Sequence, residues 1–492
     1  MVKYLLIPVV LYYSCFIFQQ LWVSYDAAVY LILARSLAQG RGYIDHFLSS
    51  PKVNLLNPPG YPSILSLSIR VFGDNLLVLR IFTILVMALS LFILTKILAK
   101  YLNKKEIIWV FLLFSLNRYT MGFVNTINSE CVYFLFSWAT ILYFSHQQNI
   151  ISPKKLIYGA LLIISAFYMR VIGISLYLSF IAYLWLNKKY RQVFLILVMG
   201  LLMFPWLVTL FSKQTGYGHF LWVKDTYTPS LSVLRAWEIP WRLFSNLKYY
   251  SGKVVGDLVF FPYLGELTFG SQFFAAKIVL SLLFSLLFFK GFYSSIKNKI
   301  SLLEIYIFVY FLLILFWPYH SERFLLPIFP FLLTYLLISL RKIRFRILSA
   351  SIVLIPLIVA IAANYELVKF SLNKNQCGQP CFAESYSWVE KNTPKEAIIM
   401  SEDPAGLYFN TQRRGVFFEL NPDPVKSFIK IKEQRINYLL LRGQSILAIN
   451  GKKISAVERY IKPLIEKYPS RISLVYQGLH KCGPLIYRVD RW

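Results

Sequence analysis

Two acidic residues stand at the ends of long apolar segments, where a carboxylate could act as an acid, a base or a ligand. Asp26 follows the first apolar segment, and Glu130 begins a later one. Ionisable groups beside a membrane are costly and are often functional. Each residue also has a structural interpretation, because aspartate is a favoured helix N-cap and a glutamate in a first turn favours the helix dipole.

Three arginines could bind a carboxylate or a phosphate, because a poorly hydrated guanidinium needs an anionic partner. Arg170 lies near the predicted outer end of an apolar segment, Arg323 lies between two segments, and Arg80 lies within one. The structural alternatives are a side chain that extends to the membrane surface and an ion pair, for example between Arg323 and Glu322.

The elements that must position these residues are predicted membrane helices. Mean hydropathy is +0.55 and only 15% of the residues are charged, against about 25% in a soluble domain. A helix needs about 20 apolar residues to cross a bilayer. Eleven segments approach this length, and those on either side of Arg170 are the shortest. They are 4–23, 75–99, 107–124, 130–146, 156–170, 172–187, 192–211, 273–293, 301–317, 324–340 and 347–366.

The excess of basic residues is explained by membrane orientation. The chain has 52 Lys and Arg against 23 Asp and Glu, a formal net charge of +29. With eleven spans, the basic clusters in short connections and Lys3 at the N-terminus all fall on one side, which is expected to be the cytoplasm. The charge also attracts anionic lipid headgroups, so membrane lipid and not nucleic acid is the predicted partner.

Two modules are predicted. Residues 1–366 form a helical membrane module with outer loops at 24–74 and 212–272, and residues 367–492 form an extracytoplasmic α/β domain of about 120 residues. Within this domain, alternating composition predicts short strands and helices. The strands are 397–400, 416–420, 438–441, 473–476 and 485–489, and the helices are 386–391 and 455–468.

The first outer loop is predicted to be ordered. An amphipathic helix is expected over residues 29–40, along the membrane interface, with Asp26 near its start. Residues 58–62, with sequence Pro-Pro-Gly-Tyr-Pro, predict a rigid turn. Long ordered loops in compact proteins are usually functional.

Cysteines in the C-terminal domain allow two interpretations. Cys377, Cys381 and Cys482, with His480, could form a zinc site. An oxidising compartment favours a disulfide instead, with one thiol left over. In the rest of the chain no Walker A or H-E-x-x-H pattern occurs, and no cluster of residues requires a metal or other cofactor, although a divalent metal would be compatible.

Several segments resemble polytopic GT-C glycosyltransferases, and more narrowly the bacterial protein O-mannosyltransferase and aminoarabinose transferase type. The most specific match is the first outer loop, over residues 26–43 and 58–62. Shorter matches bring the resemblance to most of residues 20–330, and the C-terminal domain resembles the outer domain of many bacterial members. These matches are Phe72-Gly73 with Arg80, Asn128–Glu130, Arg170–Gly173, Pro205-Trp206 and Arg323–Pro327.

The resemblance implies an enzyme that moves a sugar from a polyprenyl-phosphate carrier to a glycan, lipid or protein acceptor on the outer face of a bacterial inner membrane. Asp26 corresponds to the family's first-loop aspartate, whereas Ala27 replaces the glutamate that follows it in many members. We expect Asp26 to act as general base on the acceptor hydroxyl or to orient it, and Glu130 to shape the acceptor site.

Other candidate residues complete this expected site. The leaving phosphate gains charge in the transition state and should be held by basic side chains, namely Arg323, Arg170, Arg80 and Lys52. Contacts to acceptor or sugar are expected from Tyr30, Tyr61 and His320. Aromatic residues of the second outer loop could stack on sugar or anchor the loop in the interface; they are Trp222, Tyr227, Trp237 and Trp241. The sixth to eighth spans should line the lipid tail.

Two other function classes fit a polytopic chain of this kind. A flippase or exporter of lipid-linked sugars should carry polar residues through the middle of its spans, whereas here they gather at the predicted outer ends. A receptor or scaffold would place its function in the C-terminal domain. The distribution of ionisable residues favours the transferase.

Overall fold

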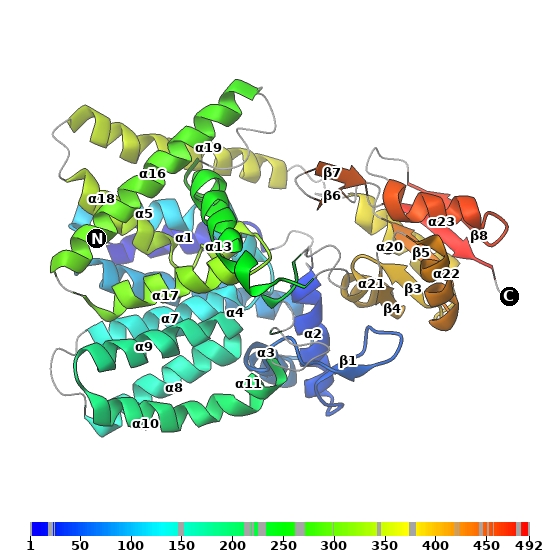
Figure 1. The fold of residues 1–492 in the computed structure, drawn as a ribbon, viewed down its shortest axis with the longest axis horizontal. Coiled ribbons are helices and arrows are strands. Elements are labelled where there is room, and N and C mark those ends of the chain that lie inside the picture. Colours follow the sequence, from blue (N-terminus) through cyan, green and yellow to red (C-terminus); the bar gives the residue numbers. More distant parts are fainter. Residues whose placement is uncertain are drawn as a thin grey trace.

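A helical body and a smaller α/β domain at one end make up the molecule (Figure 1). The computed structural model describes the chain except residues 1, 18–22, 24, 146–151, 211–217, 219–220, 225–232, 261–270, 299, 342–345, 373–379, 419–420, 422, 442–445, 450–451, 456, 479–483 and 491–492. Tyr227, Cys377, His480 and Cys482 lie outside the described residues, and the side chain of Cys381 does as well. The disulfide and zinc interpretations therefore stay predictions.

A helix lies in each of the eleven predicted segments. Among the described residues, three helices are long and apolar enough to cross a membrane, at Leu76–Leu98, Tyr190–Thr209 and Lys277–Asn298, and a bent pair would make a fourth. The polytopic helical class is therefore supported, but the number of eleven spans is not confirmed. The helices of the body are α1 (Val2–Ser14), α4 (Leu76–Leu98), α5 (Lys104–Ser115), α6 (Arg118–Asn125), α7 (Glu130–Ser145), α8 (Pro153–Met169), α9 (Ile174–Leu186), α10 (Tyr190–Gly200), α11 (Phe204–Leu210), α16 (Ser271–Asn298), α17 (Leu302–Phe316), α18 (Phe329–Leu340) and α19 (Arg346–Leu372).

Two breaks in the helical body have local causes. Asn117 accepts a hydrogen bond from the Tyr119 backbone N–H and so caps α6, which is bent by 58° from α5. Arg170 is in an extended conformation at the end of α8. A Cβ at Gly173 would lie 2.5 Å from the backbone nitrogen of Phe167, so only glycine allows the chain to turn this closely.

The segment predicted as the first outer loop contains regular helices and strands, as expected. It contains α2 (Tyr25–Ala38), the strand pair β1 (Ile44–Asp45) and β2 (Lys52–Val53), and α3 (Gly60–Phe72). The helix starts at Tyr25 and not at residue 29, which places Asp26 in its first turn. Residues 27–34 are buried on all sides, because α3 and the C-terminal domain cover the helix. The predicted amphipathic pattern is therefore wrong for this stretch, whereas the placement of the helix along the membrane interface stays a prediction.

The second outer region continues with short helices beside α16 and α17. They are η3 (Ala236–Glu238), α13 (Ile239–Tyr249), the π-helical turn η4 (Tyr250–Val254) and α14 (Val255–Phe260). Trp237 and Trp241 are more than two-thirds exposed, which fits interfacial anchoring. The 3-10 turn η5 (Glu322–Phe324) connects α17 to α18.

The C-terminal domain is built on a five-stranded sheet in the order β4-β3-β5-β9-β8. Strand β3 is parallel to β4 and β5, and β9 is antiparallel to β5 and β8. The parallel pairs need helical crossovers, which α21 and α22 supply. The elements are α20 (Pro380–Asn392), β3 (Ile399–Ser401), α21 (Pro404–Thr411), β4 (Gly415–Phe417), α22 (Pro424–Glu433), β5 (Tyr438–Leu441), β6 (Ile446–Ile449), β7 (Lys452–Ser455), η6 (Val457–Ile461), α23 (Lys462–Lys467), β8 (Ile472–Gln477) and β9 (Leu485–Val489).

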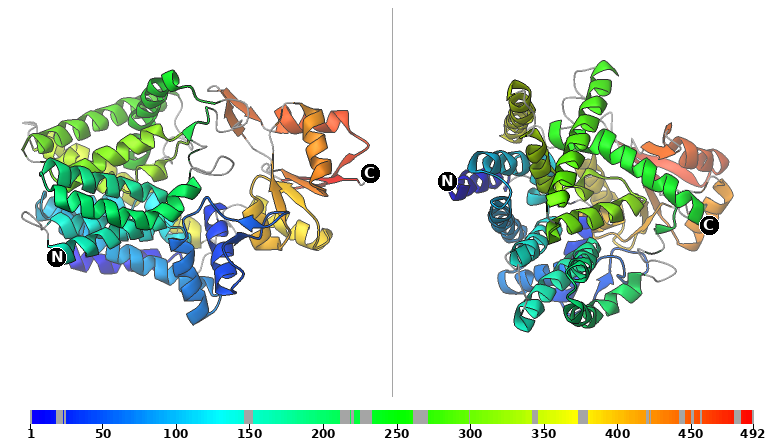
Figure 2. Two further views of the ribbon diagram at one scale, coloured as in Figure 1. Left: turned by 60° about the horizontal axis from the view of Figure 1, so that its bottom comes forward. Right: turned by 60° about the vertical axis from the view of Figure 1, so that its left-hand side comes forward.

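All five predicted strands and both predicted helices of this domain are present. The β6–β7 hairpin and the helices α21 and α22 were not predicted, because short amphipathic helices and hairpins leave weak periodicity. The preceding helix α19 continues beyond the predicted limit at 366, to Leu372. Two further views show the domain against the part of the body that contains α2 and β1 (Figure 2).

Candidate active site

Four of the predicted residues meet in one ion-pair cluster. Arg323 lies between the two carboxylates, with its Nη1 2.6 Å from Oδ2 of Asp26 and its Nε 3.7 Å from Oε1 of Glu130. Arg170 makes a second ion pair with the same oxygen of Glu130. The four side chains come from α2, η5, α7 and the end of α8, so that the cluster joins four separate elements.

Burial divides the cluster into an inner and an outer pair. Glu130 is 2% exposed and the Arg170 side chain 16%, whereas the Asp26 and Arg323 side chains are 26% and 30% exposed. A buried carboxylate is stable only when cations compensate it, and here two guanidinium groups do so. The inner pair therefore holds the outer pair, which alone is open enough to meet a substrate.

Backbone geometry presents the two arginines to the carboxylates. Arg170 projects from the break between α8 and α9, and the first residue of α3 packs directly against the end of α8. A Cβ at Gly60 would lie 2.6 Å from the carbonyl oxygen of Tyr168, so glycine permits this approach. Arg323 sits in η5, which is fixed by a hydrogen bond of 2.8 Å from the Tyr310 hydroxyl to the Phe324 carbonyl.

Ser129 and Tyr310 support the cluster but were not predicted as site residues. The Ser129 hydroxyl lies 3.2 Å from the Tyr30 hydroxyl and 3.5 Å from Nη1 of Arg170. Ser129 belongs to the Asn-Ser-Glu segment that carried part of the family resemblance, so a signal for it existed. Tyr310 is one of 34 tyrosines, and nothing in the sequence distinguishes it from a packing residue.

Tyr30 and Tyr61 lie beneath the cluster. Their rings meet edge to face at 5.1 Å, and both residues are buried, Tyr61 completely. Such rings shape the floor of a site, and they do not offer an open face to a sugar. The predicted acceptor contact by these two residues would require a binding surface that this conformation does not expose.

Two other predicted residues, Arg80 and Lys52, lie in different surroundings. Arg80 is buried and donates hydrogen bonds to the carbonyls of Phe16, at 3.0 Å, and Ile17, just beyond α1. Arg80 therefore holds this stretch of backbone, and the predicted contact with phosphate is not supported by these hydrogen bonds. Lys52 is exposed on β2. The ion pairs of the cluster are made by Asp26, Glu130, Arg170 and Arg323.

His320 faces α13. Its Nε2 lies 2.5 Å from Oδ1 of Asn246, and its ring stacks on Tyr249 at 4.4 Å between centroids. Burial lowers the pKa of His320, and the nearby charges of Lys253 and Arg242 lower it further. The imidazole is therefore neutral near pH 7 and is placed to stabilise the α17–η5 connection.

Asp45 and Asn54 form a buried pair that shapes the loop before α3. The Asn54 amide donates to both oxygens of Asp45, at 2.9 and 3.1 Å. Its own oxygen accepts from the backbone N–H groups of Leu56 and Asn57. Burial raises the pKa of Asp45 to about 6. The pair fixes the backbone that leads into α3, whose first turn contains Gly60–Pro62 of the segment predicted as a rigid turn.

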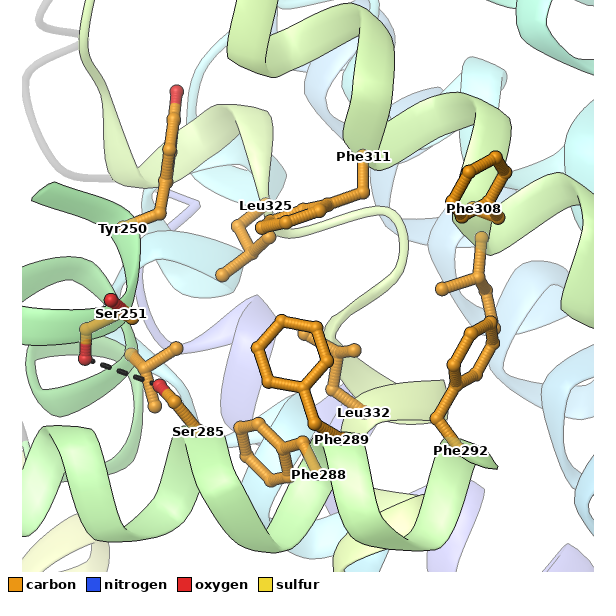
Figure 3. A pocket seen from close by; sticks show the side chains of 12 residues that line it. Tyr250, Ser251, Ser285, Phe288, Phe289, Phe292, Phe308, Phe311, Leu325 and Leu332 are labelled. Atoms are coloured by element: carbon orange, nitrogen blue, oxygen red, sulfur yellow. Dashed lines mark hydrogen bonds between the residues drawn. The ribbon is translucent and has the colours of Figure 1, made fainter. Parts of the chain in front are cut away.

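An apolar pocket opens beside the segment that carries Arg323. It lies between α16, α17, η4, the start of α14 and α18, with aromatic side chains in its walls (Figure 3). At its polar end the Ser285 hydroxyl donates to the carbonyl of Ser251 at 3.1 Å. It is lined by Tyr250, Ser251, Val255, Ser285, Phe288, Phe289, Phe292, Ile307, Phe308, Phe311, Leu325 and Leu332. Leu325 follows Arg323 by two residues, so the pocket lies next to the cluster along the chain.

Within the described part of the chain, no three His, Cys, Asp or Glu residues are grouped as metal ligands. The cluster contains two carboxylates opposed by two guanidinium groups, and its charges are balanced as they stand. Its chemistry is that of carboxylates and of anion recognition by arginine.

Comparisons with known proteins agree with this architecture. Residues 56–211 match the family of dolichyl-phosphate-mannose-protein mannosyltransferases. ArnT from Cupriavidus metallidurans, solved bound to undecaprenyl phosphate, is similar with a TM-score of 0.57 and 11% identity over 98% of this chain and 97% of that chain. The Archaeoglobus fulgidus oligosaccharyltransferase, tethered to an acceptor peptide, has a TM-score of 0.56 and 11% identity over 99% of this chain and 74% of that chain. No curated protein sequence matched.

At identities this low, the similarity to solved structures establishes the fold alone. The family match covers the segment from residue 56 to α11. The family match includes residues 58–62 of the first-loop resemblance but starts after Asp26, so the correspondence at Asp26 stays a prediction. The chain therefore has the fold of the GT-C membrane glycosyltransferases and is similar, over residues 56–211, to the dolichyl-phosphate-mannose-protein mannosyltransferase family.

Proposed function

We propose that the chain is a membrane glycosyltransferase that takes a sugar from a polyprenyl-phosphate donor and transfers it to an acceptor at the outer face of a bacterial inner membrane. The observation that carries this proposal is the position of Arg323, which bridges Asp26 and Glu130 beside an apolar pocket. The N-terminus is placed in the cytoplasm and the C-terminal domain outside, because the short basic connections then obey the positive-inside rule.

The phosphate is the part of the donor that the arginines recognise. As the bond between the sugar C1 and the phosphate oxygen breaks, negative charge builds up on the phosphate. Arg323, whose side chain is 30% exposed, turns from Asp26 toward this charge. Arg170 stays with Glu130 and keeps the local charge balanced. A guanidinium suits this exchange because it binds carboxylate and phosphate oxygens in the same fork geometry.

Asp26 acts on the acceptor once Arg323 has engaged the phosphate. Its carboxylate accepts the proton of the acceptor hydroxyl while the oxygen of that hydroxyl bonds to the sugar C1. The products are the glycosylated acceptor, the polyprenyl phosphate and the proton on Asp26. Glu130 is too buried to meet the acceptor, so we assign it to holding both arginines. No step of this proposed transfer reaction uses a metal or a cofactor.

The apolar pocket is the proposed place for the first isoprene units of the carrier. Its walls come from the eighth, ninth and tenth predicted spans and from the π-helical turn, and not from the sixth and seventh, so the expected lining is revised. π-Helical turns are rare and often occur at functional sites. The polyprenyl phosphate bound to the structural neighbour ArnT supports a donor of this class.

Transfer from a labelled polyprenyl-phosphate sugar into acceptor, in proteoliposomes, tests the proposal. Asp26→Asn should lower kcat by about 100-fold or more, because general base catalysis contributes 10²–10⁴-fold. The matched control is Glu238→Gln, which removes an outer-loop carboxylate paired with an exposed lysine and should change nothing. Full activity of Asp26→Asn would remove the base assignment.

A further inference from the structure

The C-terminal domain is joined to the first outer loop through backbone hydrogen bonds. The Gly415 N–H, at the start of β4, donates to the carbonyl of Phe47 at 2.8 Å, and its carbonyl accepts from the Ser49 N–H at 3.1 Å. Leu48 and Gly415 form a parallel β-bridge. Residues 47–49 thus extend the sheet beyond its edge strand β4. Such a junction sets both distance and register between the domain and the loop.

Two aromatic side chains of the domain contact α2. Phe417 meets Tyr25 edge to face at 5.7 Å, and Phe409 of α21 lies 4.7 Å beneath the guanidinium of Arg35. Tyr25 and Arg35 are ten residues apart, about 15 Å along a helix. Arg35 is held on its other side by Asp74 at 2.8 Å. The domain therefore contacts α2 near both of its ends. Figure 1 shows α21 beside α2.

This docking bears directly on the candidate base. Tyr25 immediately precedes Asp26, so the Phe417 contact acts on the turn that carries the carboxylate. The 2.6 Å contact between Asp26 and Arg323 exists only if the first turn of α2 is correctly placed. A misplacement of about 1 Å in a reacting group lowers rates by about 100-fold. Holding α2 from outside the membrane body would thus protect the reaction geometry.

We propose that the C-terminal domain is a positioning element of the active site, which holds α2 through Phe409, Gly415 and Phe417 so that Asp26 stays opposite Arg323. Only the expected effect on kcat rests on the proposed function, because the docking of the domain on α2 does not depend on any activity. It differs from a role in acceptor recognition, because a positioning element changes kcat whereas an acceptor subsite changes KM for the acceptor.

The kinetic test uses the full-length protein with Phe409→Ala and Phe417→Ala, singly and together. We expect the double variant to lose kcat by tenfold or more, with KM for donor and acceptor within twofold of the original. Phe417→Tyr, which keeps the ring, should restore the rate. The matched control is Leu474→Ala on β8, an exposed apolar residue at the opposite edge of the same sheet, and it should not alter kcat. A higher acceptor KM with unchanged kcat would overturn the proposal.

Hydrogen exchange measures the positioning without any reference to activity. Amides of residues 25–38 should exchange at least tenfold faster in Phe409→Ala/Phe417→Ala than in the original protein, and Leu474→Ala should leave them unchanged. Unchanged exchange in α2 would overturn the proposal, because docking would then not hold the helix. Faster exchange in a protein that shows no transfer at all would support the docking role and contradict the proposed function instead.

Discussion

Glu130 shows how one buried residue fixes a site at the residue scale. It is 2% exposed and pairs with Arg170 and Arg323, so its charge is compensated twice. The sequence singled out these three residues and Asp26 because ionisable residues are rare among the apolar segments. It could not show which partner each charge has. Arg80 illustrates the limit, since its partners are backbone carbonyls that no residue pattern reveals.

Removal of the Glu130 charge should destabilise the protein strongly. In Glu130→Gln the guanidinium of Arg170 stays buried beside a neutral amide, and breaking a buried pair costs about 3–5 kcal/mol. Thermal unfolding in detergent should show a lower Tm, and Glu130→Gln/Arg170→Met should recover part of it because both charges are gone. Glu238→Gln, at an exposed pair, is the control. A Tm for Glu130→Gln equal to that of the original protein would contradict this account.

The pair of Asp45 and Asn54 should make the first outer loop sensitive to pH. Burial raises the pKa of Asp45 to about 6, above its value of 3.8 in the absence of burial. The folded loop therefore binds this proton more tightly than the open loop, and its stability falls as pH rises from about 4 to about 6. The change is roughly 2–3 kcal/mol.

Hydrogen exchange of residues 41–57 at pH 4 and pH 7, corrected for intrinsic rates, measures this loss. Asp45→Asn should abolish most of the pH dependence, since the amide cannot ionise and still accepts from Asn54. Asp490→Asn, at an exposed pair in the C-terminal domain, should leave it intact. A loop whose protection does not change with pH would disprove the argument.

At the scale of elements, hydropathy predicted where helices lie but not how they end. Each of the eleven apolar segments contains a helix, yet the breaks at Asn117 and Arg170 depend on a side-chain cap and on the close packing of Gly173. Helix α2 was expected to be amphipathic and is instead buried on all sides over residues 27–34. Local sequence fixes local structure, whereas burial depends on which distant element packs there.

The pocket between α16, α17 and η4 allows a test at this scale. Ser285→Phe places a ring at the polar end of the pocket and should raise KM for a long-chain donor by tenfold or more. A donor with a single isoprene unit should be affected much less, because it needs less of the pocket. Leu286→Phe, the neighbouring and two-thirds exposed position on α16, provides the control. Equal effects on both donors would exclude the pocket as the carrier site.

At the scale of the whole molecule, a helical body and an α/β domain lie side by side, and the contact between them was not predicted. The strands of the C-terminal domain followed from alternating composition within short stretches. The contacts of Tyr25 with Phe417 and of Arg35 with Phe409 join residues almost 400 positions apart, and a single sequence holds no record of such pairs. A similarly long separation, of 297 positions, explains why Asp26 and Arg323 could be proposed for one site but not placed together.

The bridge between Leu48 and Gly415 has a consequence for solubility. Strand β4 is an edge of the five-stranded sheet, and an open edge is a template for pairing with other chains. Residues 47–49 occupy the backbone groups of Gly415 and shorten that edge. The helical body thereby shields the C-terminal domain from strand-to-strand aggregation, a protection that the domain would lose if it were cut free.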